Sequence, residues 1–308
     1  MKTGRSLIIS ILLLPVFCML LSGCEAEENP YTKAAEAYAQ GDYAAAEPYF
    51  IAAIESGDNR TEVVTGHAYN LMQLGRYADA ISEFLSVQAN LTSKSDVGRI
   101  KKTMLSAYLA EENYAGAARV CDELARDAAD TKEATDYLIQ AAEIRADMYE
   151  SRNETEQLIT ELEKLIELKE YAGEEYIKIY YLEAQDPDLK KRLKTADDFI
   201  MYVTGHSAFV TDYIPVITLL FNAADAAGYT DHEHDREYYY TKAEEFMDLA
   251  SEQGAGEEVI LKFKIAIAER RGKTELAYKL LGVYLNHCPE DEMALKEKEY
   301  LENRLGFE

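Results

Sequence analysis

Basic side chains are scarce in this sequence. Lysine and arginine contribute 32 residues against 57 aspartates and glutamates, so the formal net charge is −25. A chain this acidic repels the phosphates of nucleic acids and the headgroups of anionic lipids. We therefore expect no nucleic-acid partner. Tryptophan is absent as well, and tyrosine, with 23 copies, is the main aromatic residue.

Motifs that carry catalytic chemistry are also missing. No glycine-rich phosphate loop is present, and His206-Ser207 lacks the flanking glycines of a nucleophile elbow. The nearest approach to a metal site is the acidic run 231–235, with His232 and His234. One short run supplies too few ligands for a firm site, so we favour a solvated turn over a metalloenzyme. The sequence thus predicts a protein that is not an enzyme and has no cofactor or metal.

One long apolar run stands at the start of the chain. Lys2 and Arg5 precede Leu7–Leu21, which contains a single interruption at Pro15. The run is too short to cross a hydrocarbon core of roughly 30 Å comfortably, so a cleaved export signal is favoured over a permanent membrane helix.

The end of this run, Leu21-Ser22-Gly23-Cys24, resembles the lipoprotein signal of bacteria. The resemblance implies that residues 1–23 are removed, that Cys24 receives acyl chains such as palmitate, and that residues 24–29 form a lipidated tether. The protein would then be exported and lipid-anchored to the bacterial cell membrane, facing outward, and would touch the membrane through this anchor only. An ordinary secretory signal is the alternative, and the choice between inner and outer membrane stays open.

A pattern of 34 residues repeats near the start of the remaining chain. Gly41, Tyr43 and Ala46 are matched one period later, as are the positions four and seven residues after Ala46. Aligning the small residue of this pattern predicts seven repeats, each with apolar residues at the same two following positions. The aligned residues are Ala46, Ala80, Ala117, Leu158, Ala196, Ala243 and Ala277, followed at four residues by Phe50, Phe84, Cys121, Leu162, Ile200, Met247 and Leu281, and at seven by Ala53, Val87, Leu124, Leu165, Val203, Ala250 and Tyr284.

These residues resemble the tetratricopeptide repeat (TPR), a unit of two helices. The resemblance implies an all-α fold, a right-handed α-solenoid of about seven TPR-like helix pairs with a C-terminal capping helix. It implies that Gly41, Gly75 and Gly272 end first helices, that tyrosines such as Tyr43 fill the wedge between paired helices, and that Phe50 plugs the neighbouring repeat. Residues 30–134 match well, residues 135–255 diverge, and residues 256–308 hold a last repeat and the capping helix.

The divergent part and the end of the chain carry their own expectations. Repeat four has Asn153 in place of a glycine, Pro187 breaks helix five, and Gly228–Asp235 lengthens the turn of repeat six. After Pro289, residues 290–303 are expected to cap the array with apolar side chains inward and charges outward. Cys121 lies far from Cys288 in a linear array, so we expect a small buried residue rather than a disulfide.

The TPR resemblance also implies a concave groove lined by first helices. An aromatic and apolar floor with a small basic spot, to which Lys101 belongs, suits an extended peptide or a partner helix. The predicted lining residues are Tyr31, Tyr38, Tyr69, Met72, Arg99, Lys102 and Leu109. Any one of these tyrosines could instead pack between helices.

Two functions fit these features. The first is a membrane-anchored, non-enzymatic scaffold that docks a protein or peptide partner in the cell envelope. The second is a lipoprotein that captures a glycan or peptide for transport, with the divergent repeats as its pocket. The sequence names neither the partner nor the pathway.

Overall fold

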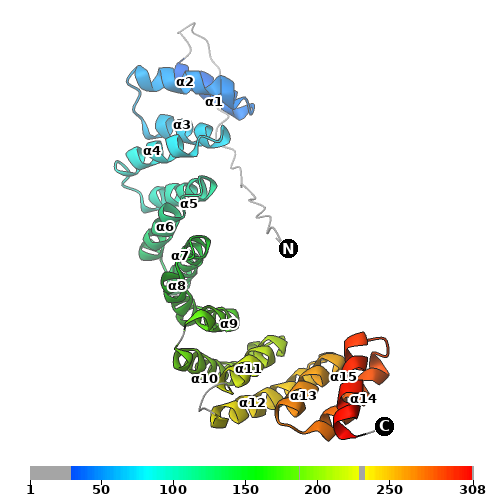
Figure 1. Ribbon diagram of the computed structural model, residues 1–308. Coiled ribbons are helices and arrows are strands. Elements are labelled where there is room, and N and C mark those ends of the chain that lie inside the picture. The colour runs from blue at the N-terminus through cyan, green and yellow to red at the C-terminus, as the bar shows by residue number, and fades with distance from the viewer. Residues whose placement is uncertain (1–28, 187, 229–232, 307–308) are drawn as a thin grey trace. The chain divides into compact units, whose positions relative to one another are not determined.

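The computed structural model describes residues 29–186, 188–228 and 233–306, and all regular structure within these ranges is helical (Figure 1). The predicted signal and Cys24 lie outside the described residues. The helices are α1 (Pro30–Ala39), α2 (Tyr43–Glu55), α3 (Thr61–Gln73), α4 (Tyr77–Gln88), α5 (Lys94–Ala110), α6 (Tyr114–Asp127), α7 (Thr131–Ser151), α8 (Thr155–Leu168), α9 (Gly173–Leu182), α10 (Leu189–Gly205), α11 (Ile214–Ala227), α12 (Glu233–Glu252), α13 (Glu257–Arg270), α14 (Thr274–His287) and α15 (Glu292–Leu305), with short 3-10 turns η1 (Glu183–Gln185) and η2 (Ser207–Phe209).

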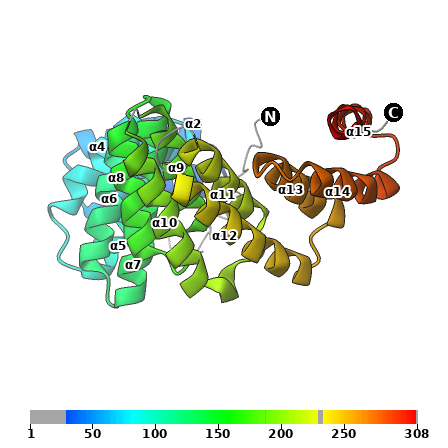
Figure 2. The same ribbon diagram turned by 60° about the horizontal axis from the view of Figure 1, so that its bottom comes forward.

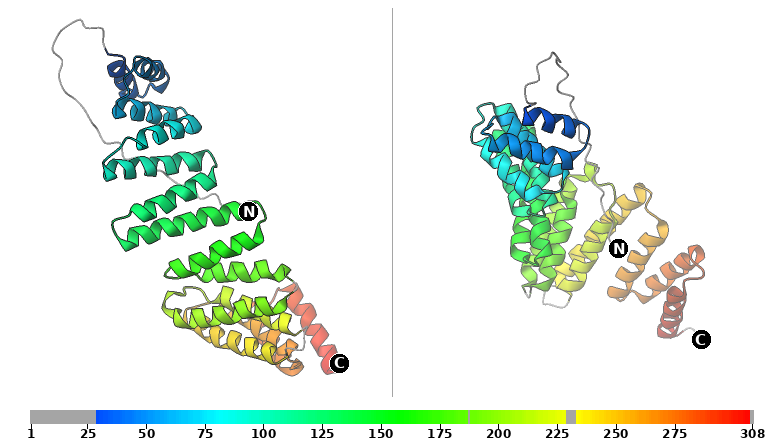
Figure 3. Two further views of the ribbon diagram at one scale, coloured as in Figure 1. Left: turned by 90° about the vertical axis from the view of Figure 1, so that its left-hand side faces the viewer. Right: turned by 90° about the horizontal axis from the view of Figure 1, so that it is seen from above.

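The chain forms two compact units, with the boundary between Ser93 and Lys94. The first unit holds the pairs α1–α2 and α3–α4. The second holds α5–α6, α7–α8, α9–α10, α11–α12 and α13–α14, followed by α15. Helices of a pair run side by side in opposite directions (Figure 3). These pairs confirm the all-α fold of seven helix pairs with a final helix.

The aligned apolar positions form the core of every second helix, from α2 to α14. All residues at the small position and at the positions four and seven residues later are at most 4% exposed. Six of the seven small positions are alanines, which let the neighbouring helices approach closely. Burying the larger partners, such as Phe84 and Met247, contributes about 1.5–3 kcal/mol each before ordering costs.

A residue with left-handed backbone joins the two helices of several pairs. Gly41, Gly75 and Gly272 have φ values of 78°, 74° and 70°, as the repeat pattern predicts. Glu112 and Asn153 occupy the same place in pairs three and four with φ of 56° and 57°. Asparagine tolerates this conformation better than most residues, which explains why pair four needs no glycine.

In pairs one and three, the side chain of the residue after this left-handed position caps the second helix. The Asp42 carboxylate accepts the N–H of Ala45 at 3.0 Å, and the Asn113 amide oxygen accepts the N–H of Gly116 at 2.9 Å. Each bond satisfies a backbone donor that has no partner inside the helix. In these two pairs, consecutive residues therefore end one helix and begin the next.

Phe50 links the first pair to the second. Its ring lies 6.3 Å from the Tyr31 ring of α1 and 5.8 Å from the His67 ring of α3. A Cβ atom on Gly66 would lie 2.8 Å from the Phe50 ring, so the close approach depends on a residue without a side chain there. This contact confirms the predicted role of Phe50 as a plug between repeats.

The expected long turn in repeat six is only partly present. Residues 229–232 lie outside the described residues, but α12 already begins at Glu233, so the turn ends earlier than predicted. The added residues lengthen the first half of α12 instead. This extra helical segment carries Tyr239 and Tyr240 into the core, where the Tyr240 hydroxyl donates to Asp225 at 2.8 Å. Burial of these two aromatic rings stabilises the segment as a helix.

Helix α15 caps the second unit but is less polar on its outer side than predicted. Ala294 and Leu301 are buried as α15 packs against α14 (Figure 2). Met293, Leu295 and Tyr300 are 75%, 46% and 54% exposed, so the expectation that apolar residues all face inward is wrong here. The reason is geometric, because a helix packed on one side only covers one narrow stripe.

Two smaller expectations concern the cysteines and the membrane. Cys121 and Cys288 are free thiols, and Cys121 is fully buried, which raises its pKa to about 11. This confirms Cys121 as a buried small residue rather than a disulfide partner. Within the described ranges, no helix combines the length and the apolar character needed to span a bilayer.

Substitution of two glycines in the α13–α14 pair should have opposite effects. A Cβ at Gly272 or at Gly282 would meet no atom within 4 Å, so neither change creates a clash. Gly272→Ala forces alanine into a left-handed conformation and should lower the free energy of unfolding by about 1–2 kcal/mol. Gly282→Ala lies inside α14 and should raise it by about 1 kcal/mol. Urea unfolding measures both; equal effects would contradict the backbone assignment.

The contact between α13 and α15 should make stability depend on pH. Burial, together with the hydrogen bond and charge of Glu297 on α15, raises the pKa of Glu269 on α13 to about 7, and the charges of Arg270 and Arg304 oppose this rise. The folded state therefore favours the protonated acid. The contribution of Glu269 to the free energy of unfolding is full below about pH 4.5 and is lost as the pH rises through 7.

Glu269→Gln removes this titration. The variant should melt at a higher temperature than the parent at pH 8 and at nearly the same temperature at pH 4.5. Glu299→Gln, an exposed change on α15, is the matched control and should show no such difference. If the melting temperatures of the parent and Glu269→Gln differ by the same amount at pH 4.5 and at pH 8, the prediction is contradicted.

Candidate functional site

The four predicted groove residues of the first unit come from its two first helices. Tyr31 and Tyr38 lie on α1, Tyr69 and Met72 lie on α3, and all four are half-buried. Tyr31 and Tyr38 are two helical turns apart and share one face of α1. Burial raises the pKa of Tyr38, and the phenols of Tyr43 and Tyr69 add to the rise. The structure therefore brings tyrosines of α1 and α3 into each other's electrostatic range.

Each of these tyrosines is also held by a ring of a second helix. The Tyr38 ring meets the Tyr43 ring edge-on at 5.3 Å, and the Tyr69 ring meets the Phe84 ring edge-on at the same distance. Tyr31 is held by Phe50, as described above. The tyrosines thus pack between helices and present part of their surface at the same time. A rigid aromatic surface of this kind loses little entropy when a partner binds.

A cation stands at one edge of this surface. The Arg60 guanidinium lies 5.3 Å from the centre of the Tyr31 ring and donates to Asp58 at 2.7 Å. Burial raises the pKa of Tyr31, Glu62 and Asp58 contribute further, and Arg60 opposes them. Both tyrosines whose pKa is raised are therefore neutral phenols at pH 7. They can donate hydrogen bonds to a polypeptide backbone, but the arrangement holds no acid–base pair.

The remaining predicted lining residues, Arg99, Lys102 and Leu109, lie on α5 in the second unit. Arg99 pairs with Asp96 at 3.1 Å, and Lys102 lies 3.5 Å from Glu133. Leu109 is half-buried. The two cations are thus partly neutralised by carboxylates of their own unit.

Lys101 completes the predicted basic spot but is buried. Its ammonium lies 2.7 Å from Asp127 and 3.1 Å from Glu123, both on α6. Its role is to tie α5 to α6, and it offers no charge to a ligand. A free basic patch on α5 was a reasonable inference from sequence, but a chain with this excess of acids supplies a carboxylate for each cation there.

The divergent repeats carry an aromatic cluster that is not evident from the sequence pattern. The Tyr202 ring lies 4.2 Å from His206, 4.9 Å from Tyr176 and 5.8 Å from Tyr171. Tyr171 stacks in turn on Phe209 at 6.5 Å, and Phe209 is 43% exposed. Tyr171 lies just before α9 and Tyr176 near its start, whereas Tyr202 and His206 lie at the end of α10 and Phe209 lies in η2. Only the tertiary fold brings these rings together.

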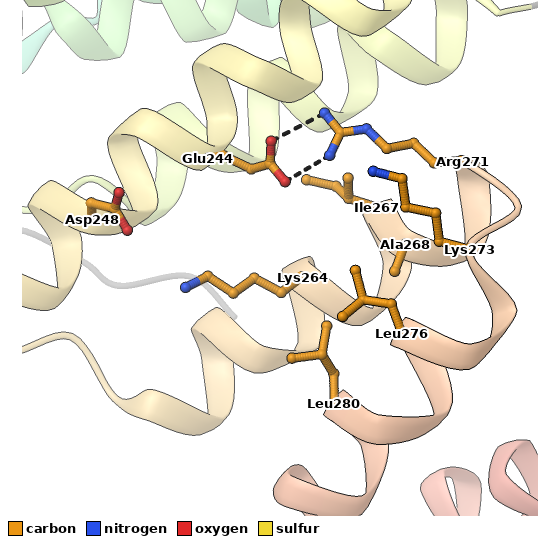
Figure 4. Close-up of a pocket in the computed structure, with 9 residues that line it drawn as sticks. All are labelled: Glu244, Asp248, Lys264, Ile267, Ala268, Arg271, Lys273, Leu276 and Leu280. Atoms are coloured by element: carbon orange, nitrogen blue, oxygen red, sulfur yellow. Dashed lines mark hydrogen bonds and ion pairs between the residues drawn. The ribbon is translucent and has the colours of Figure 1, made fainter.

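An open cleft of about 330 Å³ lies between α12, α13 and α14 in the second unit (Figure 4). Its floor is apolar, and its α12 wall is acidic, whereas α13 and the start of α14 contribute cations. The lining residues are Glu244, Asp248, Lys264, Ile267, Ala268, Arg271, Lys273, Leu276 and Leu280. This cleft was not predicted from the sequence, because its lining residues come from three helices. The available signal was Leu276 and Leu280, an apolar pair four residues apart that lies off the buried stripe of α14.

Metal-binding geometry is not found in the described part of the chain. No group of three or more histidine, cysteine, aspartate or glutamate side chains is placed to hold an ion there. Of the acidic run 231–235, residues 231 and 232 lie outside the described ranges, and the other three begin α12.

Comparisons with known proteins return TPR structures. The C-terminal part of a TPR repeat-containing protein from Cytophaga hutchinsonii is 13% identical, with 86% of this chain and 98% of that chain covered and a TM-score of 0.45. The TPR2AB domain of yeast Sti1, in complex with pHSP90, is 12% identical, with 88% and 95% covered and a TM-score of 0.43. A TPR protein from Parabacteroides merdae is 12% identical, with 89% and 98% covered and a TM-score of 0.34.

No protein-family model and no curated protein matches the chain. All three structural scores are below 0.5, so the fold assignment rests on the chain's own helix pairs.

Proposed function

We propose that this protein is a non-enzymatic scaffold that binds a protein or peptide partner through the first helices of its helix pairs. The observation that carries the proposal is the set of half-buried tyrosines on α1 and α3, each held in place by a ring of a second helix. A surface made of rigid aromatic side chains with neutral phenols provides contact area and hydrogen bonds for a polypeptide. Nothing in its chemistry suits bond making or breaking.

The proposal includes export and a lipid anchor. Residues 1–23 would act as a lipoprotein signal, and acylated Cys24 would hold the protein on the outward side of the bacterial cell membrane. The support is the charged start, the short apolar run and the sequence Leu21-Ser22-Gly23-Cys24. Several acyl chains on one residue give a stable anchor, and such an anchor does not depend on attraction between the acidic protein and the lipid headgroups.

The alternative function, capture of a glycan or peptide for transport, is favoured by the aromatic cluster of the divergent repeats. Stacked rings with an exposed member, Phe209, offer a face on which a sugar ring can lie. Soluble glycans that bind the folded protein should raise its melting temperature. Phe209→Ala should remove that shift, and Tyr238→Ala, which changes a similarly exposed ring on α12, should leave it intact.

Photo-crosslinking in cells tests the scaffold proposal. A photoreactive residue at position 69 should form one discrete protein adduct, because Tyr69 lies on the proposed binding surface. The same residue at position 55 should form none, since Glu55 is an exposed position on the second helix α2. A glycan smear from position 69, or no adduct, would contradict the scaffold and favour ligand capture.

A double substitution tests the same surface by binding. Tyr38→Ala with Tyr69→Ala should reduce capture of the crosslinked partner at least tenfold, which corresponds to about 1.4 kcal/mol. Tyr43→Ala is the matched control, because it removes the same edge-on ring contact from the side of α2. If the control reduces capture equally, the loss comes from packing and not from the surface. Circular dichroism should show unchanged helicity in all variants.

Cys24→Ser tests the anchor. The variant should lose acylation and leave the membrane fraction, and metabolic labelling with palmitate should mark the parent only. Cys121→Ser, which changes a buried thiol, should leave labelling unchanged. Retention of the Cys24→Ser protein on the membrane would contradict the lipoprotein assignment.

A further inference from the structure

Helix α15 has a stripe of apolar side chains on a side that its contact with α14 leaves open. Met293 is 75% exposed and Tyr300 is 54% exposed. The two residues are seven positions apart, close to two helical turns, so they lie on one side of α15 about 10 Å apart along its axis. Lys296 is exposed between them, and the Arg304 guanidinium lies 6.0 Å from the centre of the Tyr300 ring. We call Met293 and Tyr300 the α15 stripe.

Helix α14 has an open apolar stripe with the same spacing. Leu276, Leu280 and Val283 are four and three residues apart, so they share one side of the helix. Leu276 is 44% exposed and Val283 is 41% exposed, and Leu276 and Leu280 also line the cleft between α12, α13 and α14 (Figure 4). We call these three residues the α14 stripe.

A chain cannot cover its own α14 stripe with its own α15. The contact between α14 and α15 uses the Tyr278 hydroxyl, which donates to Glu302 at 2.9 Å. Tyr278 follows Leu276 by two residues and therefore points to nearly the opposite side of α14. Within one chain, α15 and the cleft thus lie on different sides of α14.

The two open surfaces are balanced in charge, whereas the chain as a whole has a net charge of −25. The exposed charged residues of α15 are two acids and two bases, Glu292, Glu299, Lys296 and Arg304. The cleft is lined by two carboxylates and three cations, Glu244, Asp248, Lys264, Arg271 and Lys273. An acidic surface repels a second copy of the same chain. These two surfaces escape that repulsion, and opposite charges can pair across a contact between them.

A contact between α15 of one copy and the cleft of another can form twice in one pair of molecules. Each copy has one α15 stripe and one α14 stripe, so two copies related by a two-fold axis exchange contacts and the assembly closes. A stable interface needs roughly 800 Å² from each partner. One helix of 14 residues is only about 21 Å long, so the second contact brings the interface closer to that size.

We propose that the protein self-associates by reciprocal docking, in which α15 of each copy packs against the α14 stripe and the cleft of the other. Met293 and Tyr300 of one copy meet Leu276 and Val283 of the second, because both pairs are seven residues apart. The cleft volume of about 330 Å³ holds side chains of the docked helix rather than the helix itself. The proposal goes beyond the scaffold function and does not depend on the tyrosines of α1 and α3.

Disulfide mapping in cells tests the proposal. Two full-length copies with different tags are co-expressed, both with Cys288→Ser, one with Leu276→Cys and the other with Tyr300→Cys. Copper phenanthroline, a thiol oxidant, should then join the two copies. Leu295→Cys replaces Tyr300→Cys in the matched control, because Leu295 is 46% exposed but lies on another side of α15. Copies with Cys288→Ser alone give the background.

Charged substitutions test whether the contacts are reciprocal. Met293→Glu with Tyr300→Glu alters the α15 stripe, and Leu276→Glu with Val283→Glu alters the α14 stripe. Either double variant, present in both tagged copies, should reduce co-purification of the two tags by about tenfold or more, since the apolar anchors are lost. Co-expression of the two different variants should restore part of it, because one intact stripe of each kind remains and one contact can form. All four positions are exposed, so the melting temperature should change little.

Four outcomes would overturn the proposal. A disulfide between two Tyr300→Cys copies would show that α15 packs on α15 instead. Equal crosslinking from Leu295→Cys would show a contact without the proposed side, and no restoration in the mixed variants would show that the contacts are not reciprocal. If the tags neither crosslink nor co-purify, these surfaces do not join two copies. Failure of the crosslinking experiment at position 69 would leave this test unaffected.

Discussion

Close packing of each second helix on its neighbours is the constraint on which the rest of this structure depends. A small residue, usually alanine, and two apolar residues four and seven positions later are buried in every second helix. This stripe is repeated with spacings from 34 to 47 residues, so the core tolerates changes in loop and helix length as long as the stripe is kept. The helix pairs therefore form even where the repeat motif is incomplete. In α8, for example, Leu158 replaces the alanine at the small position.

The excess of acidic residues shapes what remains available for binding. Many lysines and arginines form ion pairs that join helices, and the predicted basic spot on α5 is neutralised in this way. A cation without such a partner is then more informative than it would be in a balanced protein.

The fold could be predicted from the sequence in most respects, and the sites only in part. The pattern around Ala46 and its equivalents depends on local spacing, so all seven pairs and the final helix were predictable. The extension of α12 was not, because its stability comes from Tyr239 and Tyr240 packing against residues distant in sequence. For the same reason the sequence placed Lys101 in an open groove, whereas its partner on α6 follows 26 residues later. The aromatic cluster and the cleft exist only once three helices meet.

The contact between Phe50 and Gly66 has a consequence for how the array can be rearranged. The helix pairs of a repeat protein have similar shapes, which suggests that their order can be changed. Here the Phe50 ring of the first pair requires a residue without a side chain at position 66 of the second pair. A different helix pair inserted after the first one would meet that ring with a Cβ atom unless it carried a glycine in register. The steric fit between Phe50 and Gly66 therefore determines which helix pair can follow the first one.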